Sequence, residues 1–338
     1  MPQAARGVVG IGNAIVDVLA RVSDDTLARH GLVKGAMGLV DEARAERLLQ
    51  GLGPALECSG GSAANTMVGV ASLGGEATYV GKVRDDRLGR VFADSIRAAG
   101  VAFPAPPARG GPPTGRCVVL VTPDAQRTMQ TYLGASATLG PDDLQPATIA
   151  AGAILFLEGY LWDAPPAKQA MLAAARIARQ AGRKVALTLS DPFCVERHRD
   201  EFRQLVADHV DVLFANEEEA LALHRLGDLE ATLDRLGREC ETVAVTRSER
   251  GSIVVCGGRR YEVAATPVER VVDTTGAGDL YAAGFLFGLL RGAAPAAAGR
   301  LGSIAAAEII SHFGARPERP LAGLTAAALG GEQEARPA

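Results

Sequence analysis

The chain has 338 residues, of which 48% are hydrophobic and 22% charged, and its formal net charge is −4. This composition is typical of a globular protein with ample core material, organised as one large α/β domain or two smaller ones. The near-balanced charge excludes a basic nucleic-acid-binding surface, and no 18-residue apolar span predicts a membrane segment. The five cysteines are widely spaced without a metal-binding pattern, which predicts reduced thiols and a cytoplasmic location.

The chain opens with a predicted buried strand over residues 8–11, and an alternating pattern follows it. Apolar residues at the even positions from 14 to 22 share one face, while Asp17 falls on the other. A carboxylate in an apolar strand is costly to bury unless a ligand or donor satisfies it. Asp17 therefore either binds a ligand or belongs to an exposed strand face. The early glycines do not form a dinucleotide-binding fingerprint, because Ile15 stands where the third glycine belongs.

Residues 58–65, CSGGSAAN, lie where a loop is expected to enter a helix of small residues. The paired glycines would let a ligand hydroxyl reach backbone N–H groups. Asn65 falls one turn into the helix, where its side-chain amide can donate and accept hydrogen bonds. The alternative is a plain capped helix in which Ser59 or Ser62 serves as the N-cap.

A proline- and glycine-rich connector over residues 101–114 precedes two short strands that predict a hairpin. The hairpin interrupts a chain that otherwise alternates strands and helices. We expect a discontinuous lid from about 14–40 and 115–134, which would exclude water from a reaction beneath it. Arg127 lies in the hairpin and either closes over a ligand or sits on a solvated lid face.

In the second half of the chain, strands and helices alternate regularly, which predicts a mostly parallel sheet with helices on both faces. Ligands bind at the carboxyl ends of the strands in such sheets. Polar stretches follow three of the predicted strands, at 190–193, 216–219 and 246–247. Asn216 and Glu219 share the face of a helix start and could hold Mg²⁺ through water. An N-cap followed by first-turn acids explains the same residues equally well.

The most informative stretch is residues 273–279, DTTGAGD, directly before a buried helix. The N–H groups of Gly276, Ala277 and Gly278 lie at the helix N-terminus, where they lack intrahelical partners and can bind an anion. Asp279 follows immediately. A carboxylate beside a phosphate site makes sense if it takes a proton from a hydroxyl that attacks phosphorus. The alternative is an acid that only complements the helix dipole.

Taken in order, GGSAAN near residue 60, N-x-x-E at 216–219 and DTTGAGD at 273–279 resemble the PfkB/ribokinase family of carbohydrate and nucleoside kinases. The resemblance covers nearly the whole chain. It implies a single ribokinase-like domain over residues 1–338, α/β and doubly wound, with a β-sheet lid. It also implies ATP as phosphoryl donor and Mg²⁺ as the required ion. The tail over 320–338 is expected to be a weak, partly frayed helix.

The resemblance also implies a role for each matching residue. Asp279 matches the catalytic base, and Gly276, Ala277 and Gly278 match the anion hole. The residues expected to bind the acceptor are Asn13, Asp17, Gly61, Ser62, Asn65, Arg127 and Phe193. Those expected at the nucleotide are Asn216, Glu219, Thr246, Gly251 and Gly278, with Glu219 reaching Mg²⁺ through water. Asp273 and the Thr275 carbonyl match one side of a monovalent-cation site, usually K⁺.

Within the family, the segments GNAIVD, RTMQTYLGA and LSDPF resemble the adenosine kinase branch and its bacterial relatives. This favours transfer of the γ-phosphoryl group of ATP to the 5′-hydroxyl of adenosine, with Phe193 as a wall of the base slot. A kinase for ribose, fructose or 2-keto-3-deoxygluconate is the first alternative. A nucleotide-binding regulator without catalysis is the second, against which the intact Asp279 argues. The expected partners are a small-molecule acceptor and no nucleic acid or membrane, in a monomer or a lid-mediated homodimer.

Overall fold

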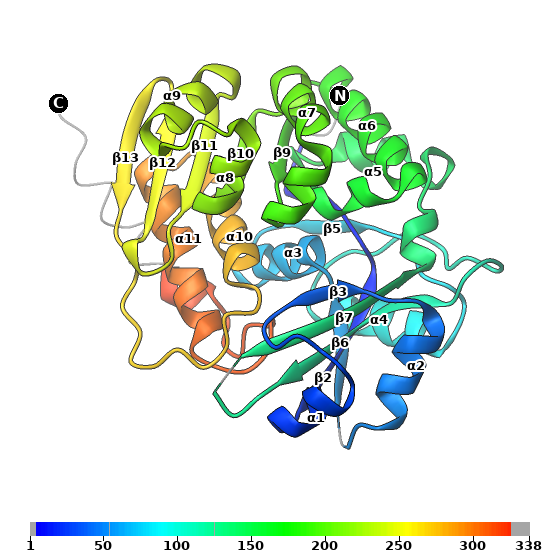
Figure 1. Ribbon diagram of the computed structural model, residues 1–338. Helices are drawn as coiled ribbons and strands as arrows, with labels where there is room; N and C mark the ends of the chain where they lie inside the picture. Colours follow the sequence, from blue (N-terminus) through cyan, green and yellow to red (C-terminus); the bar gives the residue numbers. More distant parts are fainter. Residues whose placement is uncertain (1–4, 54, 125, 326–338) are drawn as a thin grey trace.

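The computed structural model describes residues 5–53, 55–124 and 126–325, which form two separate β-sheets (Figure 1). The larger sheet has eight strands in the order β13-β12-β11-β10-β9-β8-β1-β5. Strands β5 to β11 of this order are parallel, and β12 and β13 continue it as antiparallel edge strands. The prediction of a mostly parallel sheet is confirmed. The strands are β1 (Val8–Ile11), β5 (Ala77–Val80), β8 (Ile154–Glu158), β9 (Lys184–Thr188), β10 (Val212–Asn216), β11 (Thr242–Thr246), β12 (Ser252–Cys256) and β13 (Arg259–Val263).

Helices cover both faces of the large sheet, as the doubly wound α/β prediction requires. Successive strand residues point to opposite faces, so Phe156 packs into one core and Leu155 into the other. One core includes α3 (Ser62–Ser72), α4 (Arg87–Ala98), α10 (Ala277–Leu290) and α11 (Pro295–Ile310). The other includes α5 (Pro146–Ala151), α6 (Pro165–Gln180), α7 (Pro192–His209), α8 (Glu217–His224) and α9 (Leu229–Glu239). Short 3₁₀ turns are η1 (Ala135–Thr138), η2 (Pro141–Asp143), η3 (Gly159–Asp163) and η4 (Ser248–Arg250).

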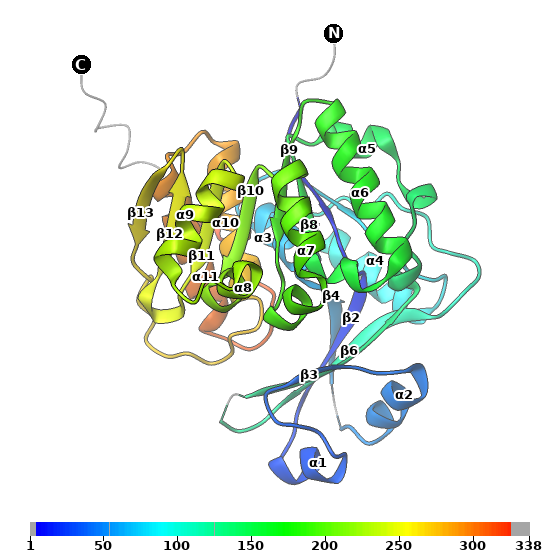
Figure 2. The same cartoon turned by 45° about the horizontal axis from the view of Figure 1, so that its top comes forward.

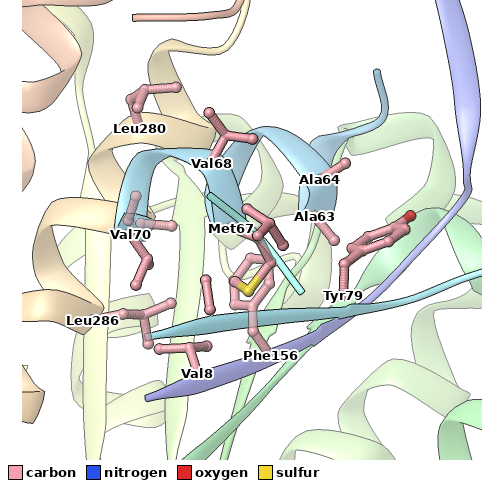
Figure 3. Packing of buried hydrophobic residues seen from close by; sticks show 14 of the residues in the cluster. Val8, Ala63, Ala64, Met67, Val68, Val70, Tyr79, Phe156, Leu280 and Leu286 are labelled. Carbon is pink, nitrogen blue, oxygen red and sulfur yellow. The ribbon is translucent and has the colours of Figure 1, made fainter. Parts of the chain in front are cut away.

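Helices α3 and α10 pack closely because small residues line their contact. A Cβ atom added at Gly69 of α3 would lie 2.5 Å from Cβ of Ala283 on α10, so only glycine allows this approach. Figure 3 shows Met67 of α3 over Phe156, with Leu286 of α10 in the same core. This packing fixes the two helices against each other. Their N-termini, which carry two of the predicted motifs, are therefore held together.

The smaller sheet has the order β3-β7-β6-β2-β4 and extends away from the larger one (Figure 2). The predicted hairpin is present as antiparallel strands β6 and β7, and the first predicted lid segment contributes the short strand β3. Strand β4 was not predicted, because the last residues of this strand were expected to form the loop before α3. The strands are β2 (Ile15–Arg21), β3 (Met37–Leu39), β4 (Leu56–Gly60), β6 (Thr114–Val121) and β7 (Arg127–Gly134).

Two helices close the far face of the smaller sheet, α1 (Asp24–Arg29) and α2 (Glu42–Gln50). Leu27 of α1 and Leu48 of α2 pack on Val118 and Leu120 of β6 in a small separate core. The opposite face of the sheet is left to line a cavity. The smaller sheet thus has the form of the predicted lid, with its own core to hold its shape.

The remaining local expectations concern helix α7, the tail, the cysteines and membrane segments. Helix α7 begins at Pro192, within the polar stretch expected to follow a strand at 190–193, because the Asp191 carboxylate accepts a hydrogen bond from Cys194 N (2.7 Å) and caps the helix. Most of the predicted tail helix lies outside the described residues. All five cysteines are free thiols, as predicted. None of the helices in the described part of the chain is both long and apolar enough to cross a membrane.

Candidate active site

A cavity of about 550 Å³ opens at the carboxyl ends of the parallel strands and is lined from both sheets. Polar side chains face it from the large sheet, including Glu158 at the end of β8 and Asn216 at the end of β10. The lid contributes a mostly apolar wall: Ile15, Met37, Leu39, Cys117, Val119, Met129, Thr131 and Leu133. The cavity therefore has one polar side and one apolar side, a combination that suits an amphipathic small molecule.

The N-terminus of α10 faces this cavity. Gly276 is its N-cap in a left-handed conformation (φ 79°), which favours glycine. The Ala277 N–H donates to Thr274 O at 3.3 Å, whereas the first bond within the helix is Leu280 N to Gly276 O. The N–H of Gly278 therefore lies before the first hydrogen bond of the helix and has no partner within it. A Cβ atom built on Gly278 would meet nothing within 4 Å. The arrangement leaves open space for an anion beside a bare amide.

The Asp279 carboxylate lies beside this space and is held by two neutral donors. Ser62 Oγ donates to its Oδ1 at 2.6 Å, and Asn65 Nδ2 donates to its Oδ2 at 2.9 Å. Burial raises the pKa of Asp279, although these hydrogen bonds and two nearby arginines oppose the rise. No ion pair of Asp279 occurs within the described residues, so the carboxylate is free to act on a ligand. A positioned carboxylate with a raised pKa suits the acceptance of a proton.

The loop that enters α3 differs from a plain capped helix. Gly61 is the N-cap, with φ +94°, and neither Ser59 nor Ser62 caps the helix, so the interpretation of either serine as N-cap is wrong. A Cβ atom on Gly61 would lie 2.3 Å from Asn13 O. Glycine is thus required by both conformation and space. The Ser62 hydroxyl, which does not cap the helix, donates a hydrogen bond to Asp279 instead.

Asp17 of β2 lies at the inner end of the cavity and is 9% exposed. A Cβ atom on Gly60 would sit 2.1 Å from its Cγ, so glycine makes room for the carboxylate. Burial raises the pKa of Asp17 to about 7; nearby Arg316 opposes the rise and the Asp279 charge adds to it. Of the two interpretations of Asp17, the exposed strand face is wrong.

Glu158, which was not among the predicted site residues, organises the floor of the cavity. Its carboxylate accepts hydrogen bonds from Asn13 Nδ2 (2.9 Å) and Ala63 N (2.8 Å), and so ties β1 and α3 to β8. Burial raises the pKa of Glu158 to about 7. Asn13 also accepts a hydrogen bond from Ser136 Oγ at 2.9 Å. The signal was available in the sequence, since Glu158 ends a predicted strand at the edge where ligands bind.

Asn216 and Glu219 form a reciprocal cap on α8 and also line the cavity. Asn216 Oδ1 accepts from Glu219 N (2.8 Å), while Glu219 accepts from Asn216 N (3.0 Å) and Nδ2 (2.7 Å). Burial raises the pKa of Glu219 to about 7. An ionised carboxylate offers about four acceptor positions, so Glu219 can also hold a metal-bound water. The pair suits Mg²⁺ held through water, because Mg²⁺ sheds its hydration reluctantly.

Arg127 reaches from the lid to the segment that leads into α10. Its guanidinium donates to Thr275 Oγ1 (2.7 Å) and Thr274 Oγ1 (2.8 Å), and its Nε lies 3.3 Å from Asp273 Oδ1. The other carboxylate oxygen of Asp273 accepts from Gly314 N at 2.9 Å. Asp273 therefore already has a cationic partner. The K⁺ site formed by Asp273 and the Thr275 carbonyl stays a prediction.

Residues 56–321 match the pfkB family of carbohydrate kinases. The chain belongs to this family. A structure of adenosine kinase from Sinorhizobium meliloti is 50% identical, covers 98% of this chain and 100% of its own, and superposes with a TM-score of 0.90. A probable sugar kinase protein from Rhizobium etli CFN 42 is 47% identical, covering 96% and 98%, with a TM-score of 0.91. The adenosine kinase of Saccharomyces cerevisiae is 28% identical over 84% of this chain and 89% of its own length.

Membership of the PfkB family confirms the family resemblance and the ribokinase-like fold predicted from the motifs. It also confirms that the chain is a kinase of the class that phosphorylates alcohol groups. The structure brings Asp17, Ser62, Asn65 and Asp279 to one cavity, although the first and last are far apart in sequence. Their individual roles stay predictions.

Three residues predicted for this PfkB site do not line the cavity: Asp273, Phe193 and Gly251. Phe193 is 71% exposed, because the cap at Asp191 starts α7 one residue before it and turns the ring to solvent. The prediction that Phe193 forms a wall of the base slot is wrong in this structure. Gly251 shapes the turn after β11 instead of lining the cavity, and a Cβ atom there would lie 2.0 Å from Val263 O. Thr246, at the end of β11, does face the cavity.

Proposed function

We propose that this PfkB kinase is an adenosine kinase, which transfers the γ-phosphoryl group of ATP to the 5′-hydroxyl of adenosine to give AMP. One observation carries the proposal. The Asp279 carboxylate stands between the open amide end of α10 and a polar acceptor clamp, beneath an apolar lid wall. The 50% identity to the Sinorhizobium adenosine kinase over the full chain supports adenosine as the acceptor.

The acceptor clamp suits a ribose whose base extends under the lid. Asp17 and Asn65 would hold the ribose diol, and Asn65 Oδ1 has no hydrogen-bond partner among the described residues. A buried acceptor without a partner is costly, and a ligand hydroxyl would satisfy it. The aliphatic lid wall, including Val119 and Met129, would cover the flat face of a purine. A free sugar would leave that wall in contact with water.

In the proposed mechanism, the clamp aims the 5′-hydroxyl at Asp279, which takes its proton as the oxygen attacks the γ-phosphorus. The N–H groups at residues 276–278 and the Arg127 guanidinium meet the negative charge of the transferring group. Glu219, oriented by Asn216, would hold waters of a Mg²⁺ ion that neutralises the ATP phosphates. Closure of the lid keeps bulk water away from the phosphoryl group.

The test of this function is a panel of acceptors with MgATP. Adenosine is expected to give the highest kcat/KM, above inosine, ribose, fructose and 2-keto-3-deoxygluconate. The second candidate, a sugar kinase, is favoured by the 47% identity to the Rhizobium protein that carries that name. Phosphorylation of a free sugar at more than ten times the kcat/KM for adenosine would replace adenosine as the acceptor.

The acidic residues of the site predict the pH dependence of this reaction. The pKa of Asp17 is raised to about 7 and that of Asp279 is raised as well, both mainly by burial. Because both must be ionised, we expect kcat/KM to fall as pH drops below about 7, by roughly tenfold per unit from Asp17 alone and more steeply where Asp279 is protonated as well. Initial rates from pH 5 to 9 at constant ionic strength would measure this. A rate that stays level down to pH 5 would show ordinary carboxyl pKa values.

The ion pair between Arg127 and Asp273 predicts little dependence on K⁺. Its 3.3 Å separation places a cation at the carboxylate that would otherwise need one. We expect kcat in tetramethylammonium chloride to lie within about twofold of kcat in KCl at equal ionic strength, since the fixed charge is supplied by the chain. An increase of tenfold or more on adding K⁺ would contradict this assignment.

We further propose that the protein acts as a monomer in the cytoplasm. The far face of the lid is already covered by α1 and α2, so two lids could not pair through that face. The cytoplasmic assignment rests on the free cysteines.

A further inference from the structure

Arg316 lies in the loop after α11 and reaches under the acceptor clamp. Its Nε donates to Ser59 O at 3.1 Å, its Nη1 to Ala64 O at 3.2 Å and its Nη2 to Ser59 Oγ at 2.8 Å. These acceptors belong to β4 and the first turn of α3, on either side of the glycine pair. The guanidinium therefore fastens the C-terminal loop to both ends of the segment that carries Gly61 and Ser62.

Every one of these hydrogen-bond acceptors is neutral. Cys58 also lies beside the guanidinium, but burial raises the pKa of its thiol to about 11, so the sulfur carries no charge near neutral pH. Arg316 makes no ion pair within 4 Å in the part of the chain that the structure describes. Its positive charge is thus held in place without being neutralised by a directly bonded carboxylate.

Two carboxylates of the proposed mechanism lie in the field of this charge. Asp17 and Asp279 both interact with Arg316 electrostatically, and the charge of Asp279 raises the pKa of Asp17 further. Two buried like charges favour protonation of one of them, unless an opposite charge compensates. Only an ionised Asp279 can accept a proton, and an ionised Asp17 is the stronger acceptor for a ribose hydroxyl.

We propose that Arg316 is a positioning residue of the kinase: it clamps the glycine loop and supplies a fixed positive charge that favours the ionised forms of both Asp17 and Asp279. This inference rests on the proposed function, because it concerns the proton acceptor and the acceptor clamp of that reaction. Arg316 contacts neither carboxylate. It acts on them through its electrostatic field and through the glycine loop that it holds.

The other charged and titratable groups around the two carboxylates do not supply this charge. Arg127, from the described part of the lid, also acts on Asp279, and it already faces Asp273 at 3.3 Å. The remaining groups are acids or neutral when buried, and they add no positive charge: Cys58 of β4, Cys117 of β6, Glu158 of β8, Tyr160 of η3 and Glu219 of α8. Among these groups, Arg316 is the cation without a carboxylate partner.

The test is the pH dependence of kcat/KM for adenosine in the full-length wild type, Arg316→Met, Arg316→Lys and Arg21→Met. Arg21→Met is the matched control, because Arg21 stacks on Phe313 of the same loop, 5.3 Å from the ring centroid, outside the cavity. In the profile of kcat/KM against pH, we expect the midpoint of the acidic limb to lie about one pH unit or more higher in Arg316→Met than in the wild type. The reason is that loss of an opposite charge shifts a carboxyl pKa by about 1–3 units. For a shift of one unit, its activity would then fall about sixfold more at pH 6.5 than at pH 8.5.

The lysine variant separates charge from shape. In Arg316→Lys, the midpoint of the acidic limb should stay within about 0.3 pH unit of the wild type, because an ammonium keeps the positive charge. Its kcat should be somewhat lower, because an ammonium cannot make the same hydrogen bonds to both sides of the glycine loop. An equal loss for Arg316→Met at every pH would overturn the inference. So would an acid limb of Arg316→Lys displaced by one unit, which decides the matter even if the methionine variant does not fold. A wild type inactive on every acceptor would overturn the proposed function and this inference together.

Discussion

Replacement of Asp279 by Asn is expected to lower kcat by roughly 10²–10⁴-fold or more, the scale of losing a positioned general base. The substitution preserves the size of the side chain. Ser62 Oγ can still donate to the Asn oxygen, and Asn65 can turn its unpartnered Oδ1 toward the new amide. Fold and ATP affinity should therefore remain close to the wild type. Steady-state kcat, calorimetric ATP binding and the melting temperature together measure these three expectations.

Asp24→Asn is the matched control for this substitution. Asp24 also lies in the first turn of a helix, α1 of the lid, but away from the cavity. If the acid at 279 only complemented the dipole of α10, both variants would lose a few tenths of a kcal/mol of stability and neither would lose kcat. Near-normal turnover by Asp279→Asn would remove that residue from the role of base.

Replacement of Gly278 by Ala should separate activity from stability. No atom lies within 4 Å of the added Cβ, and Gly278 is the second residue of α10, where alanine favours the helix by up to about 1 kcal/mol. The melting temperature should stay equal or rise. The methyl group would instead occupy the space left for the transferring phosphoryl group. We expect kcat/KM to fall by about 10²–10³-fold, the usual cost of losing one such donor contact.

Gly110→Ala provides the comparison, because its added Cβ also meets nothing within 4 Å but lies on the connector before the lid. It should leave both kcat/KM and the melting temperature unchanged. Wild-type activity in Gly278→Ala would show that no anion approaches this backbone during the reaction, and the proposed anion hole would have to lie elsewhere.

Much of the fold could be predicted from the sequence because its signals are local. The apolar runs of β8 to β12 read as buried strands, and regular alternation with helices is enough to predict a parallel sheet. The motif at 273–279 placed the start of α10 correctly, since glycine conformation and the lack of intrahelical partners at a helix N-terminus depend only on neighbouring residues. Asp17 stood out because a carboxylate interrupts an apolar strand.

What the sequence could not predict depends on contacts between distant segments. Phe193 looked like a wall of the site, but the cap at Asp191 turns it to solvent. No sequence pattern assigned Glu158 or Arg316 to the acceptor clamp, and only the packing of β8 and of the loop after α11 brings them beneath it. The amino-acid sequence determined which groups could do the chemistry. Tertiary structure decided which of them share one buried space, because burial and the charge of neighbours set the pKa of each acid.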